Sequence, residues 1–356
     1  MNFQKKLGEL KAAINKELEY QLDIEIKDIQ KKDDLMAKAL VQIKKIVLAG
    51  GKRMRGALLC QAYFGLGGKE RKKILKIAAA IELAHLFCLV HDDIIDRGNL
   101  RHGQTTLHNF FATRKANSPF SKDAMHYGNS MAIVVGDFIY AFAIKIITRA
   151  GFDDEITVKA MNHLQSIILT TVIGQGQDIE ITYKNNVAEK DVFVMYENKT
   201  ARYSIEGPLH LGAIFAGCNS QKILNSLSNY AMPIGVAFQI QDDILGVFGN
   251  EKKIGKSTAS DISEGKQSIV VVKARELSSY KQKIQLNSIL GKKNLTNKEI
   301  DKFQDIIRST GALEYSKKMS AVYLKKGKKE MKRAIILPNA KNFFIELAEY
   351  LENREV

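Results

Sequence analysis

The stretch IELAHLFCLVHDDIID, residues 81–96, ends a mostly apolar run with three aspartates. The stretch AMPIGVAFQIQDDILG, residues 231–246, ends a second apolar run with two more. Both runs have the composition of a buried helix, yet a buried carboxylate without a partner is strongly destabilising. The two stretches therefore predict sites where solvent, basic side chains or a divalent cation offsets the acidic charge.

Length and composition indicate a helical protein. The chain has 356 residues, of which 45% are apolar, and it contains only 4 prolines. Strand-like alternation is rare and short linkers separate the apolar runs, so we predict a single all-α domain over residues 1–356. The predicted helices span residues 3–20, 33–50, 54–66, 70–98, 128–150, 154–182, 190–218, 221–248, 265–277, 297–309, 311–334 and 338–354.

Cysteine content and the start of the chain indicate a cytoplasmic protein. The cysteines Cys60, Cys88 and Cys218 are scattered without metal-binding spacing, as is typical of reduced thiols. Residues 1–20 are charged and amphipathic, unlike a signal peptide. The most apolar run, residues 131–147, is shorter than a membrane span and contains two charged residues, so we expect a core helix and no transmembrane segment.

The net charge of +15 fits a solvated lysine-rich surface or an anionic partner, such as a phosphate, a nucleic acid or a membrane surface. The basic residues are spread along the chain, apart from the dense run YLKKGKKEMKR at residues 323–333. No zinc spacing or other nucleic-acid signature accompanies them, so no nucleic-acid partner is expected. The dense run predicts weak contact with an anionic membrane surface.

The acids of the first stretch suit a magnesium site. On a helix, Asp92 and Asp96 are four residues apart and share a face. An Asp-Asp pair at a helix end is also common on protein surfaces, but two such pairs after apolar runs favour a function. Oxygen ligands without Cys or His suit Mg²⁺, which is often shared between one or two carboxylates and the phosphates of a substrate.

The basic residues that a phosphate requires lie close to these acids in the sequence. They occur in GGKRMRG (50–56), NLRHG (99–103), NKT (198–200) and GKSTASDISEGK (255–266). Each of these residues alone is more often solvated surface than ligand, but four clusters near two acidic motifs favour a diphosphate site.

In their order and spacing, these motifs resemble those of the trans-isoprenyl diphosphate synthases, the short-chain polyprenyl synthetases. The matching motifs span residues 50–270 and comprise GGKRMR, H-x6-DDIID, LRHG, GD (136–137), GQGQD (174–178), KT (199–200), FQIQDD (238–243), GK and EGK. The resemblance implies the all-α isoprenoid-synthase fold, an antiparallel helical bundle around a deep central cavity, usually in a homodimer. It also implies a prenyltransferase that uses two or three Mg²⁺ ions to condense isopentenyl diphosphate with an allylic diphosphate.

The resemblance assigns roles to particular residues. Those implied as metal ligands are Asp92, Asp96 and Asp242, with Asp93 in support. Those implied to bind the allylic diphosphate or line its reacting carbons are Arg101, Gln175, Lys199, Thr200, Gln239, Lys256 and Lys266, with Asp178 beside them. Those implied to bind isopentenyl diphosphate are Lys52, Arg55, His85 and His102. The catalytic role falls to Asp92, Asp93, Asp96, Arg101, Lys199, Asp242 and Lys256.

Product length in this family depends on the floor of the cavity below the first motif. A large residue, Phe87, and a small one, Cys88, resemble the floor of enzymes that stop near twenty carbons, which predicts geranylgeranyl diphosphate. Ordinary core packing also accounts for Phe87, and farnesyl or twenty-five-carbon products are the alternatives.

Two positions depart from the family pattern. Gly246 stands where many relatives have a third aspartate, and His102 stands where most have a second arginine. A neutral His102 predicts a weaker grip on isopentenyl diphosphate and a raised KM. A catalytically silent partner subunit is one alternative that these departures support. A class I terpene cyclase of the same fold is a separate alternative, although it would not need the GGKRMR clamp.

Overall fold

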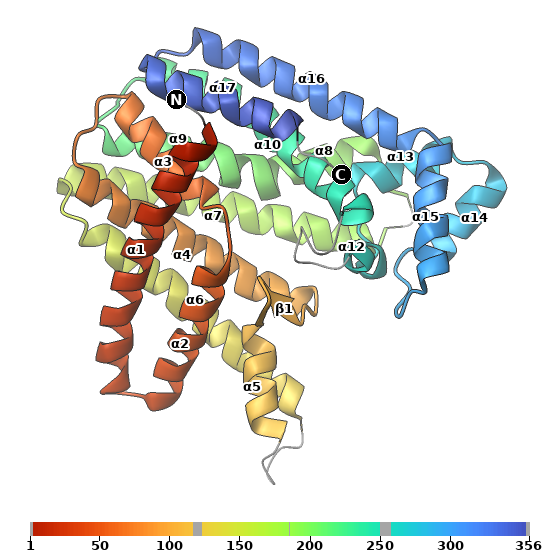
Figure 1. Ribbon diagram of the computed structural model, residues 1–356, viewed down its shortest axis with the longest axis horizontal. Helices are drawn as coiled ribbons and strands as arrows, with labels where there is room; N and C mark the ends of the chain where they lie inside the picture. The colour runs from red at the N-terminus through yellow and green to blue at the C-terminus, as the bar shows by residue number, and fades with distance from the viewer. Residues whose placement is uncertain (1–2, 117–122, 185, 250–257, 354–356) are drawn as a thin grey trace. The chain divides into compact units, whose positions relative to one another are not determined.

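The structure is a computed structural model that describes residues 3–116, 123–184, 186–249 and 258–353. The chain forms two compact units, one of Met1–Cys60 with Gly68–Met161 and the other of Gln61–Gly67 with Asn162–Val356. Nearly every element in the described residues is a helix (Figure 1), which confirms the prediction of an all-α fold.

The first unit is built on paired helices. It contains α1 (Phe3–Gln30), α2 (Asp34–Ala49), the start of α3 (Met54–Gly65), α4 (Arg71–Ile95), β1 (Leu100–Arg101), β2 (Gln104–Thr105), α5 (Leu107–Ala116), α6 (Ala124–Thr148) and the start of α7 (Asp154–Thr182). Figure 1 shows α1 and α2 as an antiparallel pair. The apolar residues of α1 recur every three or four positions, which places Leu7, Leu10, Ile14, Leu18 and Leu22 on its buried face.

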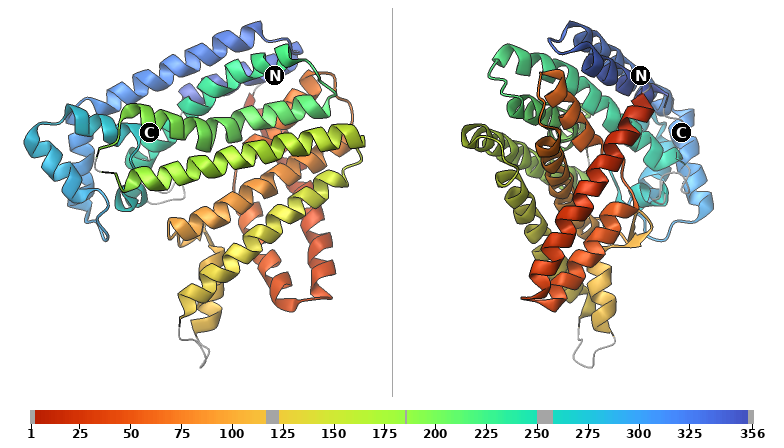
Figure 2. Two further views of the ribbon diagram at one scale, coloured as in Figure 1. Left: turned by 180° about the vertical axis from the view of Figure 1, so that it is seen from behind. Right: turned by 60° about the vertical axis from the view of Figure 1, so that its left-hand side comes forward.

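The second unit holds the longer helices. It contains the end of α3, the rest of α7, α8 (Glu189–Tyr196), the π-helix η1 (Glu197–Glu206), α9 (Gly207–Phe215), α10 (Gln221–Phe248), α12 (Thr258–Glu264), α13 (Ile269–Leu277), α14 (Tyr280–Ile289), α15 (Asn297–Ser309), α16 (Ala312–Arg333) and α17 (Pro338–Glu352). The helices α10, α16 and α17 lie side by side (Figures 1 and 2). Tyr230 of α10 is fully buried and donates a hydrogen bond of 2.7 Å to the carbonyl oxygen of Phe344 in α17.

The π-helix η1 replaces the middle of the helix predicted over residues 190–218. Two glycines from neighbouring helices allow it to pack closely. A Cβ placed on Gly174 of α7 would lie only 2.6 Å from the Cα of Lys199, and one on Gly235 of α10 would lie 2.6 Å from the Cβ of Ala201. Any larger residue at either position would therefore push η1 away. Because π-helices are rare and commonly occur at functional sites, this segment is a candidate part of the site.

The predicted helices are otherwise close to those observed, and the differences are local. The first helix reaches Gln30 rather than residue 20, and the helices α5 and α14 were not predicted. The predicted helix 265–277 corresponds to α13, which begins only at Ile269, and α12 before it was not predicted. Gly265, whose φ of +76° is left-handed, ends α12.

Two described helices, α4 and α6, are long and apolar enough to cross a membrane by length and composition alone. The buried share of the most apolar window is 61% in α4 and 44% in α6. Core helices of soluble proteins meet the same criterion, and α4 packs against α6 within the first unit.

A histidine pair in the second unit predicts acid sensitivity. The rings of His163 (α7) and His210 (α9) have centroids 5.1 Å apart, and His210 Nε2 lies 3.0 Å from Ser228 Oγ. Burial lowers the pKa of His163 to about 4, with a smaller contribution from the charge of His210. The unfolded chain therefore binds a proton near pH 6.5 that the folded chain takes up only near pH 4.

We accordingly expect the free energy of unfolding to be highest above pH 6.5 and to fall by about 3 kcal/mol as the pH drops toward 4. Urea unfolding across this range measures the loss. His163→Phe keeps an aromatic ring but does not titrate, so it should reduce the slope, whereas the same change at the exposed His126 should not. Equal slopes in all three proteins would contradict the prediction.

Candidate active site

The first acidic motif lies at the C-terminal end of α4, and its middle acid, Asp93, is already paired. The Asp93 carboxylate is buried and accepts hydrogen bonds from Arg101 Nε at 3.1 and 3.3 Å, with a further bond from Nη2 to Oδ1. Burial raises the pKa of Asp93, and the hydrogen bond from Arg101 opposes this shift. Asp92 and Asp96 are only partly buried, so the predicted metal ligands differ from Asp93 in their exposure.

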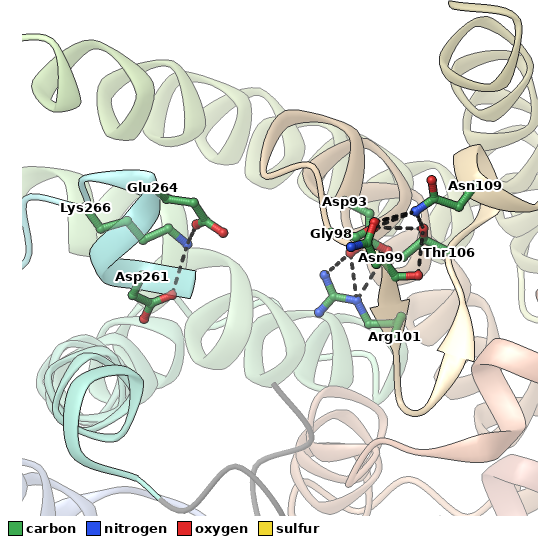
Figure 3. Close-up of polar contacts among 9 residues, drawn as sticks. All are labelled: Asp93, Gly98, Asn99, Arg101, Thr106, Asn109, Asp261, Glu264 and Lys266. Carbon is green, nitrogen blue, oxygen red and sulfur yellow. Dashed lines mark hydrogen bonds and ion pairs between the residues drawn. The ribbon is translucent and has the colours of Figure 1, made fainter. Parts of the chain in front are cut away.

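A polar clamp holds the loop that follows this motif (Figure 3). Thr106 Oγ1 donates to the carbonyl oxygen of Gly98 at 2.8 Å, and Asn109 Nδ2 donates to Asn99 Oδ1 at 3.1 Å. The amide of Gly98 in turn donates to the carbonyl oxygen of Asp93 at 2.9 Å. Thr106 and Asn109 were not predicted as site residues, because nothing in their local sequence signals a clamp.

The LRHG motif forms a β-hairpin that was not predicted. Leu100 pairs with Thr105 and Arg101 with Gln104, and the two-residue turn has positive φ at both His102 (53°) and Gly103 (74°). This is the geometry of a type I′ turn, whose twist matches that of the strands it joins. The hairpin sets Arg101 against the end of α4. Burial alone would lower the pKa of Arg101, but its hydrogen bond to Asp93 and the charges of the motif's three aspartates raise it.

In the GGKRMRG loop, the middle basic residue has a structural role. Arg53 is buried, its Nε donates to Asn15 Oδ1 at 2.7 Å, and Nη2 donates to the carbonyl oxygen of Val47. These bonds anchor the loop. Lys52 is exposed and Arg55 is partly buried, so they are the members of this loop that remain candidates for binding a phosphate.

The basic motifs of the first unit meet around His85. Burial lowers the pKa of His85 well below its usual value, and the charges of Arg55, Arg101, Arg53 and His102 lower it further. The His102 side chain fills the space beside Gly50, since a Cβ on that glycine would lie 2.7 Å from the Cβ of His102. Burial and the nearby cations also lower the pKa of His102, so both histidines are neutral at pH 7.

An aromatic cluster lies below the first motif. The ring of Phe87 is 5.0 Å from that of Tyr140 in α6 and 4.8 Å from that of His91. The GD pair at 136–137 supports this arrangement. Gly136 leaves room for the His91 ring, since a Cβ would lie 2.8 Å from its Cδ2, and Asp137 lies 3.8 Å from His91 Nε2. Cys88, on the same helix, is partly buried and is not part of a disulfide.

In the second unit, η1 and α7 bring a lysine to an acid. Lys199 Nζ donates to Asp178 Oδ2 at 2.5 Å, and Asn198 Nδ2 donates to Gln177 Oε1 at 3.1 Å. Gln177 was not predicted as a site residue, although it belongs to the GQGQD motif. Gln175 lies on the same helix and is partly buried.

A chain of hydrogen bonds joins η1 to α10 and α13. Thr200 Oγ1 donates to Gln239 Oε1 at 2.6 Å, and Gln239 Nε2 donates to Asp243 Oδ1 at 2.8 Å. Tyr196 Oη donates to Asp243 Oδ2 and accepts from the amide of Ile269 at 2.8 Å. Burial, with smaller contributions from the charges of Asp261 and Asp242, raises the pKa of Asp243 to about 7, and the hydrogen bonds from Tyr196 and Gln239 oppose this shift. Asp243 is therefore engaged in this hydrogen-bond network, and Asp242 is the predicted metal ligand of the second motif.

The predicted cation Lys266 lies between two acids of α12 (Figure 3). Its Nζ is 3.1 Å from Glu264 Oε2 and 3.7 Å from Asp261 Oδ1. The other predicted cation of this region, Lys256, lies outside the residues that the structure describes.

The carboxylates of the two acidic motifs each suit a hard cation. Asp92 and Asp96 in the first unit, and Asp242 in the second, offer the oxygen ligands that Mg²⁺ prefers. Within the described parts of the chain, no three His, Cys, Asp or Glu side chains converge as a ready-made metal site.

Comparison with known proteins identifies the group to which these features belong. The model of the polyprenyl synthetase family matches residues 37–307. The short chain isoprenyl diphosphate synthase of Methanocaldococcus jannaschii is 33% identical over 85% of each chain. The geranylgeranyl diphosphate synthase of Sulfolobus acidocaldarius is 34% identical over 78% of each chain.

A solved structure extends the likeness to the whole chain. The geranylgeranyl pyrophosphate synthase of Corynebacterium glutamicum, solved with isoprenyl diphosphate and magnesium, superposes with a TM-score of 0.90 over 100% of both chains at 27% identity. The prediction from the motifs is thus confirmed: the chain belongs to the polyprenyl synthetase family and is a short-chain prenyl diphosphate synthase.

Proposed function

We propose that this enzyme condenses isopentenyl diphosphate with allylic diphosphates, head to tail, and releases mainly the twenty-carbon product, geranylgeranyl diphosphate. The observation that carries the proposal is the end of α4, where Arg101 occupies Asp93 while the partly exposed Asp92 and Asp96 flank it. A relative named geranylgeranyl diphosphate synthase, 34% identical, supports the product. The family match spans both compact units, which supports one polyprenyl synthetase domain.

The acidic and the basic residues of the proposed site both act on the departing diphosphate. Asp92, Asp96 and Asp242 would hold two or three Mg²⁺ ions, which when bound neutralise charge on the departing diphosphate. Arg101, Lys199, Lys256 and Lys266 would bind the same diphosphate and stabilise its developing charge as the allylic carbon–oxygen bond breaks.

The allylic cation that results requires electron-rich neighbours and a dry environment. The oxygens of Thr200 and Gln239 are held in place by their mutual hydrogen bond, and we assign them to the reacting carbons, with Gln175 nearby. Lys52, Arg55, His85 and His102 would hold isopentenyl diphosphate so that its double bond attacks the cation. Loss of a proton to the released diphosphate completes a product five carbons longer.

Turnover by the purified chain alone tests this function. Labelled isopentenyl diphosphate is incubated with Mg²⁺ and a five-, ten- or fifteen-carbon allylic diphosphate, and the label in acid-labile prenyl diphosphate is counted. We expect condensation with at least one starter. Release of hydrocarbon without incorporation of label would indicate a terpene cyclase. Absence of turnover until an active synthase is added would indicate a silent subunit.

Product length gives a second prediction. We assign Phe87 and Cys88 to the floor of the site, with Phe87 backed by Tyr140. Phe87→Ala removes the ring that would stop the growing chain, so we expect the main product to lengthen by five carbons or more, as measured by mass spectrometry. Phe152→Ala, which removes an aromatic ring beside Lys73, is the control and should leave product length unchanged. An unchanged product from Phe87→Ala would assign that ring to core packing only.

Exposed apolar residues support the predicted homodimer. On α7, Leu169, Val172 and Ile173 share one face and are 67%, 58% and 58% exposed. Such patches on a soluble protein mark interaction surfaces, and we propose that a second copy covers this one. Val172→Glu should then lower the mass measured by light scattering to that of one chain, 39.9 kDa, whereas Val322→Glu on α16 should not. A one-chain mass for the unmodified protein would contradict the homodimer.

The basic run of α16 supports weak contact of this cytoplasmic protein with an anionic membrane. Lys325, Lys326, Lys329 and Lys332 are exposed, and Leu337 beyond the helix is 55% exposed. We propose that the lysines bind lipid headgroups while the leucine enters the interface. The protein should sediment with vesicles containing phosphatidylserine and not with neutral ones; absence of sedimentation with either would exclude this contact.

A further inference from the structure

A buried tyrosine lies at the far end of the hydrogen-bond chain that reaches Thr200. Tyr196 is the last residue of α8, directly before η1, and it is 1% exposed. Its ring packs edge-on against that of Phe193, with the ring centroids 6.0 Å apart. A buried hydroxyl is costly unless it is hydrogen-bonded, so the partners of Tyr196 indicate what it does.

These partners fix the direction in which Tyr196 donates its hydrogen. The amide of Ile269, the first residue of α13, can only donate, and it lies 2.8 Å from Tyr196 Oη. The hydroxyl therefore accepts from α13 and directs its own hydrogen to Oδ2 of Asp243. The other oxygen of Asp243, Oδ1, accepts from Gln239 Nε2 at 2.8 Å. Since an ionised carboxylate can only accept, Asp243 requires a donor on each side.

The direction of these bonds determines how Thr200 meets its surroundings. Because Nε2 of Gln239 faces Asp243, its Oε1 faces Thr200, whose hydroxyl donates to it at 2.6 Å. A hydroxyl has one hydrogen and two lone pairs. With its hydrogen donated to Gln239, Thr200 Oγ1 presents lone pairs to any other group that approaches it. Oxygen lone pairs stabilise a neighbouring carbocation, whereas a hydrogen pointed at it would not.

All of the linked elements belong to the second unit. The hydrogen bonds run from α13 to the end of α8, then to α10 and finally to η1. Beside Thr200, a Cβ on Gly235 would lie 2.6 Å from the Cβ of Ala201, so α10 and η1 are in close contact there. The backbone thus fixes where these two helices meet, and the hydrogen bonds fix how the polar groups between them are oriented.

We propose that Tyr196 is a positioning residue that orients the hydroxyl of Thr200. It acts through Asp243 and Gln239, so that oxygen lone pairs face the allylic cation. The inference rests on the proposed function, because it assumes that this cation forms beside Thr200. Without the tyrosine hydroxyl, Oδ2 of Asp243 loses its donor, and the amide of Gln239 turns toward it and away from Thr200.

Tyr196→Phe removes the hydroxyl and keeps the ring. The rate of a single turnover is measured with enzyme in excess over an accepted allylic diphosphate. We expect this rate to fall about tenfold, since a small displacement of a group beside the reacting atoms can cost this much. The diphosphate groups are bound by other residues, so the KM values and the inhibition constant of inorganic diphosphate should stay within about twofold.

Tyr230→Phe is the matched control. Tyr230 is also fully buried, and it donates one hydrogen bond, of 2.7 Å, to the carbonyl oxygen of Phe344. Both variants lose a buried hydrogen bond and should lower the Tm, but only Tyr196→Phe should lower the single-turnover rate. Asp243→Asn is a second variant of the same chain of bonds. Its amide nitrogen cannot accept from one of the two donors, so it should reproduce the loss of rate.

A double-mutant cycle shows whether Tyr196 acts through Thr200. Thr200→Val removes the hydroxyl that Tyr196 orients, and Thr200→Ser keeps it. Adding Tyr196→Phe to Thr200→Ser should lower the rate about tenfold again. Adding it to Thr200→Val should lower the rate by less than about twofold, because the group that it positions is already absent.

A single-turnover rate in Tyr196→Phe as high as that in Tyr230→Phe would overturn the proposal. Equal losses on adding Tyr196→Phe to Thr200→Ser and to Thr200→Val would overturn it as well. Product assays on the unmodified protein separate the two inferences. If it forms no prenyl diphosphate, the proposed function fails and the role of Tyr196 fails with it. If it forms product and Tyr196→Phe condenses normally, only the role of Tyr196 fails.

Discussion

Asp92→Ala is expected to lower kcat for condensation by about a thousandfold while leaving the free energy of unfolding nearly unchanged. Asp92 is only partly buried at the end of α4, and without it Arg101 still has the carboxylate of Asp93 as its partner. What is lost is a ligand for the cation that offsets charge on the departing diphosphate. Initial rates at saturating substrates measure the first effect, and urea unfolding measures the second.

The neighbouring acid, Asp93, should instead contribute mainly to the free energy of unfolding. Asp93→Ala leaves Arg101 without its buried partner, and loss of one member of such a pair costs about 3–5 kcal/mol of stability. Asp28→Ala, which removes an exposed acid of α1, is the control for both and should change neither quantity. Equal losses of activity and stability in Asp92→Ala and Asp93→Ala would contradict the separate roles given to these two acids.

The second large loss of activity is expected from Gly174→Ala, which adds a single methyl group to α7. Gly174→Ala places a Cβ 2.6 Å from the Cα of Lys199, so η1 must shift and carry Lys199 and Thr200 with it. We expect kcat to fall about a hundredfold, as displacements near 1 Å can produce in an active site. The free energy of unfolding should also fall by about 1–3 kcal/mol.

Gly176 in the same motif is the matched control. It has no neighbouring atom within 4 Å of a Cβ, so Gly176→Ala meets open space. In a helix this change should be neutral or stabilise the protein by about 0.5–1 kcal/mol, with activity retained. If both alanine variants retained activity, the close contact of η1 with α7 would not position Lys199.

Much of the fold could be predicted from the sequence because long apolar periodicity marks long helices. The helices over 154–182, 221–248 and 297–309 begin and end where they were predicted. The hairpin at 100–105 escaped prediction because two-residue strands carry no alternation that could reveal them. The π-helix escaped because its residues have an ordinary helical pattern, and its close contacts with Gly174 and Gly235 involve other helices.

The candidate site, like the fold, could be predicted from the sequence only in part. Motif spacing predicted the acids and cations, but not which of them the protein itself engages. Arg53 anchors a loop and Asp93 binds Arg101, and both facts depend on partners distant in sequence. Asp261 of α12 lies where a side chain at Gly246 of α10 would begin, and no local pattern in QDDILG could have revealed this contact between two helices.

The mass of the main product tests the central claim most directly. The purified protein, with Mg²⁺ and isopentenyl diphosphate, would receive the five-, ten- or fifteen-carbon allylic diphosphate in turn, beside Asp92→Ala. The account predicts that every accepted starter is extended to twenty carbons and that the variant forms almost no product. Products that stop at fifteen carbons or pass twenty would contradict the assigned floor, and no condensation from any starter would contradict the function itself.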